Sequence, residues 1–353
     1  SLPPAFHYAV CKSKKDREKP TIGFSPELTV LLPVKNEALL INRKIEEILS
    51  TEYPLNKIRL LIVDSNSTDK TLEIAKKSLN SKNQLLEITF HSVNEPGKSR
   101  AVNVALDKIK TDFFIMMDTD CILKKDSIPK IMDNFVNENI GAVCGSQDTS
   151  KSSSADSYRI RFNRIRIGES IIDSTPIFEG SICAFRTKSI GDQRLDPNIN
   201  ADDSQLAIIV RKAGFKAIMD GSVKFIDIQP NSRKRSLRRS QGLFRVFMKN
   251  LDLMSNYEKY SSIYRQNLYF YVIYSWVVIT FFSLAFASTV ISFMIENDET
   301  HFSILQLLLF FSILIPRTSR GLLVGSSIMV ESQLRLFIGD RMQIWEPSRE
   351  DNE

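Results

Sequence analysis

The sequence predicts an α/β protein with a mainly parallel sheet flanked by helices, followed by a C-terminal transmembrane helical hairpin. Over the first part of the chain, apolar runs alternate with helical patterns in units of about 30 residues, an order typical of parallel sheets. Nearer the C-terminus come two longer apolar runs, and the first exceeds the ~20 residues that cross a bilayer.

The composition limits the kinds of protein that the chain can be. It has 353 residues, of which 43% are hydrophobic and 25% charged, which suits one large domain plus an appendage. The net charge of +6 suits phosphorylated ligands, a membrane surface or nucleic acid. No aromatic-basic RNA motif is present, so we expect no nucleic-acid partner. The 4 cysteines lack C-x-x-C spacing, which favours a reduced cytosolic setting, and 3 scattered histidines argue against a zinc site or a histidine-based nucleophile.

The first half of the chain contains four strand patterns. Residues 1–27 are predicted to be a polar lead-in that crosses the surface, and because the sequence starts with Ser1 rather than Met, we expect the native start to be missing. Continuous apolar runs then predict strands covered on both faces. Apolar residues at helical spacing separate them, and Gly97-Lys98 opens one of these helices. The predicted strands are residues 28–34, 60–64, 85–90 and 113–117.

Two carboxylates directly follow the fourth strand. Asp118 and Asp120 lie at its carboxyl end, where open α/β sheets place their ligands. In extended chain, side chains i and i+2 point the same way, so both carboxylates can reach one cation. Mg²⁺ and Mn²⁺ are usually held by one or two carboxylates plus substrate phosphates. The pattern therefore predicts a metal-bridged phosphate site, with a solvated turn as the alternative.

The second half is less regular. Residues 146–157 form a serine-rich polar link, an apolar strand-like piece begins at Gly180, and a helical pattern begins at Asp202-Asp203. Residues 233–245 carry six cationic side chains with interleaved apolar residues. This pattern suits an anionic lipid surface or a diphosphate, and the alternative is a solvated basic face.

The apolar runs near the C-terminus predict a membrane hairpin. Residues 269–295 carry no charge, residues 296–301 form an acidic turn, and residues 302–316 are apolar again. Cationic residues mark the cytoplasmic side of a membrane. The turn between the two runs has none, whereas Arg317 and Arg320 flank the far end of the second run. We therefore expect an integral membrane protein with its catalytic domain and C-terminus cytoplasmic. A buried hairpin in a soluble protein is the alternative.

Five segments follow from these patterns. Residues 321–338 mix apolar side chains with Glu331 and Arg335, which suits an interfacial helix better than a third span. The predicted segments are a lead-in (1–27), a cytoplasmic α/β domain (28–250), an interfacial linker (251–268), a two-helix transmembrane hairpin (269–320) and an interfacial or cytoplasmic tail (321–353).

Taken together, these pieces resemble the family-2 glycosyltransferases of GT-A fold, in the membrane-bound branch with the cellulose, hyaluronan and ceramide-glucoside synthases. The resemblance covers roughly residues 28–250 plus the hairpin. Five motifs in the right order are specific where each alone is weak. The matching stretches are Leu31-Leu32-Pro33-Val34-Lys35-Asn36-Glu37, Val63-Asp64-Ser65-Asn66-Ser67-Thr68-Asp69, Gly97-Lys98-Ser99-Arg100-Ala101-Val102-Asn103, Asp118-Thr119-Asp120 and Asp202-Asp203.

The resemblance implies roles for individual residues. Asp120, with Asp118, would hold Mg²⁺ or Mn²⁺, which neutralises the diphosphate of the donor. Asp203 would be the general base, which takes the proton from the acceptor hydroxyl. The alternative for Glu37 and Asp202 is to serve only a helix N-terminus. The expected nucleotide- or donor-binding residues are Pro33, Val34, Glu37, Asp64, Lys98, Asp118, Gly180, Asp202, Arg239 and Gln241.

One family motif, Q-x-x-R-W, departs from the pattern. The corresponding region, residues 238–245, lacks the Arg-Trp pair. In polymerising members that tryptophan stacks under the terminal sugar of the growing chain, so its absence favours transfer of a single sugar. Arg238, Arg239 or Arg245 could still bind the diphosphate, and Arg239 with Gln241 is preferred. Trp345 could close over the site or anchor at the membrane interface.

The predicted function is that of an inverting, metal-dependent glycosyltransferase. It would move one sugar from a nucleotide-sugar donor, expected to be a UDP-sugar, to a hydroxyl of a membrane lipid or lipid-linked acceptor. A polyprenyl-phosphate acceptor is one alternative, in which Asp203 binds rather than deprotonates, and a processive polysaccharide synthase subunit is another. A membrane-tethered nucleotide-sugar-binding scaffold is the non-enzymatic alternative, against which the intact set of Asp118, Asp120 and Asp203 argues.

Overall fold

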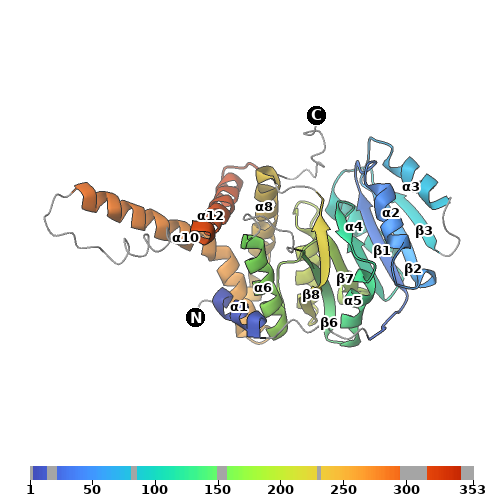
Figure 1. The fold of residues 1–353 in the computed structure, drawn as a ribbon, viewed down its shortest axis with the longest axis horizontal. Coiled ribbons are helices and arrows are strands. Elements are labelled where there is room, and N and C mark those ends of the chain that lie inside the picture. The colour runs from blue at the N-terminus through green and yellow to red at the C-terminus, as the bar shows by residue number, and fades with distance from the viewer. Residues whose placement is uncertain are drawn as a thin grey trace.

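The computed structural model is an α/β domain from which one long helix, α10, projects (Figure 1). It describes residues 3–13, 22–80, 86–148, 157–228, 232–294 and 316–342. The strands are β1 (Leu28–Val34), β2 (Ile58–Asp64), β3 (Glu87–Ser92), β4 (Phe113–Met117), β5 (Cys121–Leu123), β6 (Ile140–Gln147), β7 (Ile182–Arg186) and β8 (Lys216–Asp227). The helices are α1 (Pro3–Ser13), α2 (Ile41–Leu49), α3 (Thr71–Asn80), α4 (Lys98–Lys108), α5 (Ser127–Asp133), α6 (Ser157–Ile172), α7 (Asp202–Lys212), α8 (Arg233–Lys249), α9 (Asp252–Ser255), α10 (Ser262–Met294) and α12 (Pro316–Phe337).

The first four predicted strands form the parallel half of an eight-stranded sheet. Their order is β3-β2-β1-β4, and the register places Leu31 beside both Leu61 and Met116. Every residue of β1 and β4 is buried, because helices cover both faces. This half of the fold is as predicted, and it aligns the carboxyl ends of β1, β2 and β4 along one edge.

The other half of the sheet is mixed rather than mainly parallel. β7 runs antiparallel to both β4 and β6, while β8 is parallel to β6 and antiparallel to β5. Because β7 runs against β4, its first residue, Ile182, pairs with the last residue of β4, Met117. The loop before β7 therefore lies beside Asp118, whose N–H donates to the Ser181 carbonyl at 3.3 Å.

Three apolar cores hold the layers together. One core packs α2 and α5 on one face of the sheet, and a second packs α4 and α7 on the other. The third core lies outside the sheet and joins α7, α8 and the first turns of α10, with Tyr264 and Leu268 each 1% exposed. The residues predicted to form an interfacial linker, 251–268, are thus packed partly into this third core.

The lead-in differs from the prediction, because its first part is a packed helix. His7 of α1 is buried, and its Nε2 lies 2.8 Å from Oδ1 of Asn267 in α10. A Cβ at Gly168 in α6 would lie only 2.0 Å from the carbonyl oxygen of His7, so a glycine is what lets the two helices approach. α1 therefore does not cross the surface but joins α6 to α10.

The described part of the predicted hairpin is one apolar helix. Within residues 262–288 of α10, an 18-residue window has a mean hydropathy of 1.9, and 17% of that window is buried. By length and composition it could cross a membrane. The second predicted span, residues 302–316, lies outside the described residues except for Pro316, so the hairpin is not confirmed. α12 is a helix over the predicted interfacial segment and packs on α8, where Ser332 Oγ lies 2.8 Å from Ser240 Oγ.

Candidate active site

Three helix and strand ends meet at the carboxyl edge of the parallel strands, and Lys98 links them. Lys98 begins α4, Asp118 follows β4, and Asp202 begins α7. The Lys98 Nζ lies 2.7 Å from Asp118 Oδ1 and 3.0 Å from Asp202 Oδ2. Burial alone lowers the pKa of Lys98, but the carboxylates of Asp118 and Asp202 outweigh it and raise this pKa well above its usual value. Lys98 is therefore a fixed cation between the two acidic motifs.

Gly180 lies at the centre of this cluster. A Cβ built on it would lie 3.2 Å from Asp203 Oδ2, 3.5 Å from Asp118 Oδ2 and 3.6 Å from Lys98 Nζ. The glycine leaves open the space that these three charged groups surround. The structure thus brings together four of the residues that the sequence singled out, from four separate segments of the chain.

Asp203 occupies a site that favours its protonated form. Its Oδ1 accepts a hydrogen bond from the Ser204 N–H at 2.7 Å, while Oδ2 faces Gly180. Burial, and then the charge of Asp202, raise the pKa of Asp203 to about 7, although Lys98 acts in the opposite direction. A carboxylate with a pKa near the working pH is suited to general-base catalysis. Asp202 does not cap α7, because the N-cap position is Ala201, which has no side-chain cap hydrogen bond.

Asp120 lies on the other side of the cluster, toward α8. Its Oδ2 is 3.4 Å from a guanidinium nitrogen of Arg235. Burial and the charge of Asp118 raise the pKa of Asp120, and Arg235 opposes them. Within the described residues, no group of three or more His, Cys, Asp or Glu side chains is arranged to hold a metal ion. Two carboxylates do fit Mg²⁺ or Mn²⁺, which take further ligands from phosphate oxygens and water.

The ends of β1 and β2 supply the remaining predicted residues. Pro33 and Val34 are the last two residues of β1, and Glu37 is buried just beyond them. Asp64, the last residue of β2, is 4% exposed, and its Oδ2 accepts from the Ser67 N–H at 3.2 Å. Its Oδ1 is buried without a hydrogen-bond partner among the described residues. Such an atom is costly to leave unsatisfied, so a ligand hydroxyl or N–H is its natural partner.

α8 directs several arginines toward the acidic cluster. Arg235, Arg238 and Arg239 share one helix face, because they are three and four residues apart. The charges of Asp118 and Asp202 act on Arg238, and those of Asp118 and Asp203 act on Arg239, so both guanidinium groups lie near the acids. The prediction for Arg239 fits this placement, whereas Arg235 was missed. Its spacing from Arg239 was the signal that could have found it.

Arg245 and Gln241 lie elsewhere. Burial and the nearby charge of Arg341 lower the pKa of Arg245. Arg245 therefore lies away from the acidic cluster. Gln241 is buried, its Nε2 donates to the Asp340 carbonyl at 2.9 Å, and its Oε1 accepts from the Met342 N–H at 3.0 Å. Gln241 therefore lies on a different face of α8 from Arg239, because residues two apart along a helix do not share a face. Its role in donor binding stays a prediction. Trp345 lies outside the described residues.

Glu179 is a further charged residue at the site that the sequence did not single out. It precedes Gly180, its carboxylate forms an ion pair with Arg166 of α6, and its charge acts on both Asp203 and Arg239. Its only sequence signal was its position next to Gly180.

Comparison with known proteins shows a family resemblance over part of the chain. The model of glycosyl transferase family 2 matches residues 29–193, which include β1 to β7 and the Asp118–Asp120 motif. Residues 29–193 are thus similar to a family 2 glycosyltransferase domain.

The relatives of this chain include enzymes of lipid synthesis. It is 28% identical over 118 residues to the beta-monoglucosyldiacylglycerol synthase of Synechocystis sp., a match covering 33% of this chain and 25% of that one. The synthase of the same name from Nostoc sp. is 28% identical over 126 residues, covering 36% and 27%. The chain thus matches about a quarter of the length of these relatives.

One solved structure resembles nearly the whole chain. It is the mannosyltransferase PcManGT from Pyrobaculum calidifontis in complex with GDP-Man and Mn²⁺, with a TM-score of 0.78 and 22% identity, covering 95% of this chain and 94% of that one. At this identity the likeness shows the fold alone, which is GT-A-like with a mixed sheet.

Proposed function

We propose that this protein is a glycosyltransferase that moves a single sugar from a nucleotide-sugar, with inversion at the anomeric carbon, to a hydroxyl of a membrane lipid or lipid-linked acceptor. The convergence of Asp203, Asp118 and Lys98 around Gly180 carries the proposal. The base (Asp203), a cation (Lys98) and the carboxylate nearest the expected diphosphate (Asp118) border one small open space. Transfer to a hydroxyl requires such an arrangement.

The reaction is a single displacement in which Asp203 is the base. The Asp203 carboxylate takes the proton from the acceptor hydroxyl as the oxygen of that hydroxyl forms a bond to the anomeric carbon. The bond from that carbon to the diphosphate oxygen breaks, and the nucleoside diphosphate leaves. Attack opposite the leaving group inverts the configuration. General-base assistance of this kind is typically worth ~10²–10⁴-fold.

Cations stabilise the charge on the leaving diphosphate. Lys98 stands beside Asp118, and Arg238 and Arg239 approach from α8. A Mg²⁺ or Mn²⁺ ion held by Asp118 and Asp120 would neutralise further diphosphate charge. The presence of Mn²⁺ in the complex of the mannosyltransferase with GDP-Man supports this assignment.

The nucleoside would lie across the ends of β1 and β2. Asp64 offers its unpaired Oδ1 to a hydroxyl or N–H, and Pro33, Val34 and Glu37 border the same edge. We propose a UDP-sugar as the donor, with a GDP-sugar as the alternative, because the mannosyltransferase of similar fold was solved with GDP-Man.

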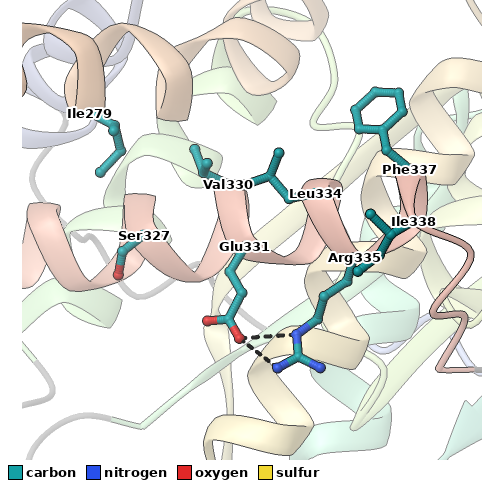
Figure 2. A pocket seen from close by; sticks show the side chains of 8 residues that line it. All are labelled: Ile279, Ser327, Val330, Glu331, Leu334, Arg335, Phe337 and Ile338. Atoms are coloured by element: carbon teal, nitrogen blue, oxygen red, sulfur yellow. Dashed lines mark hydrogen bonds and ion pairs between the residues drawn. The ribbon is translucent and has the colours of Figure 1, made fainter.

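Two observations support a lipid acceptor. The relatives named above are synthases of a glucosylated diacylglycerol. α10 is long, apolar and mostly exposed, which suits a bilayer, and we propose that the protein is integral to the membrane with its catalytic domain and C-terminus cytoplasmic. An apolar groove of about 690 Å³ lies between α10 and α12. Figure 2 shows the side chains that line it, which are Ile279, Ser327, Val330, Glu331, Leu334, Arg335, Phe337 and Ile338.

Transfer assays in lipid test the proposal. Purified protein in lipid vesicles would be supplied with a panel of labelled UDP- and GDP-sugars, with and without Mn²⁺. Metal-dependent label in an extractable lipid that survives mild acid supports a hydroxyl acceptor. Acid-labile label identifies a polyprenyl phosphate instead and removes the base role of Asp203. If no donor supports transfer and Asp203→Asn binds the donor as wild type does, the protein is a sugar-nucleotide-binding scaffold rather than an enzyme.

A further inference from the structure

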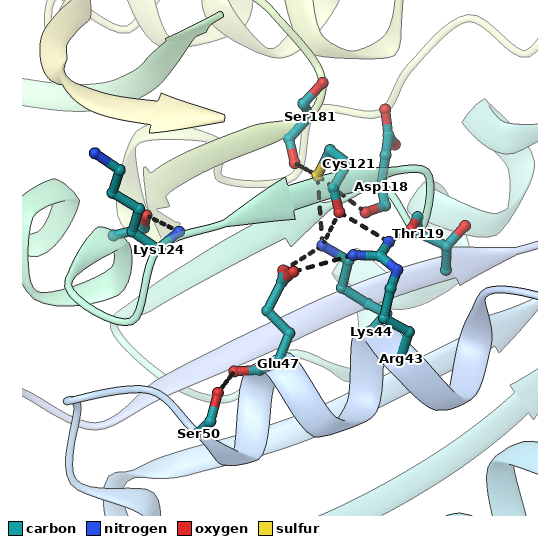
Figure 3. Close-up of polar contacts among 10 residues, drawn as sticks. Arg43, Lys44, Glu47, Ser50, Asp118, Thr119, Cys121, Lys124 and Ser181 are labelled. Atoms are coloured by element: carbon teal, nitrogen blue, oxygen red, sulfur yellow. Dashed lines mark hydrogen bonds and ion pairs between the residues drawn. The ribbon is translucent and has the colours of Figure 1, made fainter. Parts of the chain in front are cut away.

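A charged cluster on α2, fully buried at Lys44, contacts the segment that carries the Asp118–Asp120 motif (Figure 3). It consists of Arg43, Lys44 and Glu47, which we call the α2 clamp. The Lys44 side chain is 0% exposed, and its Nζ lies 2.5 Å from Glu47 Oε1. Glu47 Oε2 also accepts from Arg43 at 3.2 Å. A lysine is almost never fully buried unless its charge is paired, so this position needs an explanation.

The clamp donates to the backbone on both sides of Asp120. Arg43 donates to the Thr119 carbonyl at 2.6 Å and to the Cys121 carbonyl at 3.0 Å. Lys44 Nζ also donates to the Cys121 carbonyl, at 2.7 Å. The carbonyl of Asp120 itself accepts from the Ile228 N–H, at 2.9 Å. Three successive carbonyls are therefore held, and the backbone that carries the Asp120 carboxylate has little freedom to rotate.

The Cys121 side chain extends these contacts to Asp118. Its Sγ lies 3.4 Å from Lys44 Nζ, 3.3 Å from the Asp118 carbonyl and 3.2 Å from the Ser181 carbonyl. The thiol can donate a weak hydrogen bond to either carbonyl. One network thus joins α2, both residues of the acidic motif and the residue after Gly180.

We infer that Arg43 and Lys44 are positioning residues that set the Asp118 and Asp120 carboxylates for the divalent cation and the diphosphate. This inference rests on the proposed function. If the clamp only neutralised its own charges, the two oxygens of Glu47 would suffice for both cations. Instead four donor contacts reach the two carbonyls flanking Asp120 and the neighbouring thiol.

Mn²⁺ binding provides a readout that is independent of turnover. Arg43 suits substitution because its side chain is 32% exposed, whereas removing the fully buried Lys44 endangers folding. Electron paramagnetic resonance of free Mn²⁺ would be titrated with the full-length protein and saturating UDP or GDP. We expect Arg43→Met to raise the Mn²⁺ Kd about tenfold, in the range found when supports of metal ligands are removed. Arg43→Lys keeps a donor and should restore most of the affinity.

Arg59→Met is the matched control, because Arg59 is an ion-paired arginine of β2 that is 43% exposed. It should leave the Mn²⁺ Kd unchanged, and thermal unfolding of both methionine variants would be compared. An Arg43→Met protein that binds Mn²⁺ like wild type overturns the inference. So does a loss of affinity in Arg43→Met that Arg43→Lys does not restore. Wild type that fails to bind Mn²⁺ with either nucleotide overturns the metal part of the proposed function, and the inference with it.

Discussion

At the scale of single residues, the environment of Asp203 sets the pH at which the enzyme can work. Its pKa of about 7 means that the carboxylate is fully available as a base only above that pH. The rate of transfer should therefore rise with pH and level off above about 7, the pKa set by burial and by Asp202. A pH profile of kcat/KM measures this rise.

Asp202→Asn should move that rise to lower pH. Removing the neighbouring negative charge lowers the pKa of Asp203, since the charge of Asp202 is the second cause of its elevation after burial. The matched control is Asp107→Asn, which removes an ion-paired carboxylate that is 60% exposed, in a pair with Arg194. A profile of Asp202→Asn that coincides with those of wild type and the control contradicts the assignment of Asp203 as the base.

Asp203→Asn should stabilise the fold above pH 7 while abolishing transfer. The folded-state pKa of about 7 exceeds the ordinary value of 3.8, so the folded protein favours the protonated carboxyl. The stability that this proton contributes is present at low pH and is lost as pH rises through about 7. An asparagine at position 203 does not ionise, so the variant does not lose this stability as the pH rises. We expect a higher Tm for Asp203→Asn than for wild type at alkaline pH and a smaller difference at acidic pH; a difference independent of pH would argue against the raised pKa.

The predicted site residues that the structure brings together are those next to the end of a predicted element. Lys98, Asp118 and Asp203 each border a strand or helix whose end the pattern located, and such ends meet at one sheet edge. The positions of Gln241 and Arg235 relative to the acidic cluster could not be predicted, for one reason. They lie within a helix, and the sequence does not say which face of α8 meets the acids.

At the scale of elements, α8 connects the acidic cluster to the C-terminal segment. A Cβ at Gly242 would lie 2.1 Å from the Asn200 carbonyl oxygen, so α8 packs directly on the loop that precedes Asp202. Asn200 donates in turn to the Met342 carbonyl, and Gln241 binds the backbone of Asp340 and Met342. Residues 340–342 therefore lie across α8 and the start of α7.

Gln241→Ala and Arg239→Ala should have opposite effects. The first removes both side-chain contacts to the C-terminal segment, so hydrogen exchange at Met342 should become faster while the Kd for UDP or GDP stays within about twofold. The second removes a cation from the phosphate side, so the nucleotide Kd should rise while exchange at Met342 stays the same. Weaker nucleotide binding in Gln241→Ala, with unchanged exchange, would restore the role in donor binding that the sequence suggested.

The parallel half of the fold was predictable, whereas the mixed half was not. β1, β2 and β4 are continuous apolar runs bounded by polar residues, which is how strands buried on both faces read. β8 interrupts its apolar residues with Asp220 and Gly221, so no run marks it. The direction of β7 leaves no trace in its five buried residues, because a buried strand looks the same in either direction.

At the scale of the whole molecule, the catalytic domain and the apolar helix form one continuous structure. α10 begins inside the third core, where Tyr264 and Tyr271 are buried, and then extends beyond the domain (Figure 1). Tyr271 donates to the buried Glu169 of α6 at 2.9 Å, which fixes the root of the helix. Further along, large apolar side chains such as Leu284 and Phe286 are more than half exposed. Such a helix would place the site at a fixed height above a bilayer.

Leu284→Arg tests whether α10 lies in a bilayer. An arginine near the centre of a transmembrane helix costs about 2.5–3.5 kcal/mol on insertion scales, whereas at an exposed position in water it costs almost nothing. Leu284 is 56% exposed, and Leu39, on the catalytic domain, is 81% exposed, so Leu39→Arg is the matched control. We expect Leu284→Arg to lower the fraction of protein that remains in membranes after an alkaline carbonate wash, and Leu39→Arg to leave it unchanged. Equal retention of both variants and wild type would mean that α10 is not inserted, and the acceptor would then have to reach Asp203 from solution rather than from a membrane.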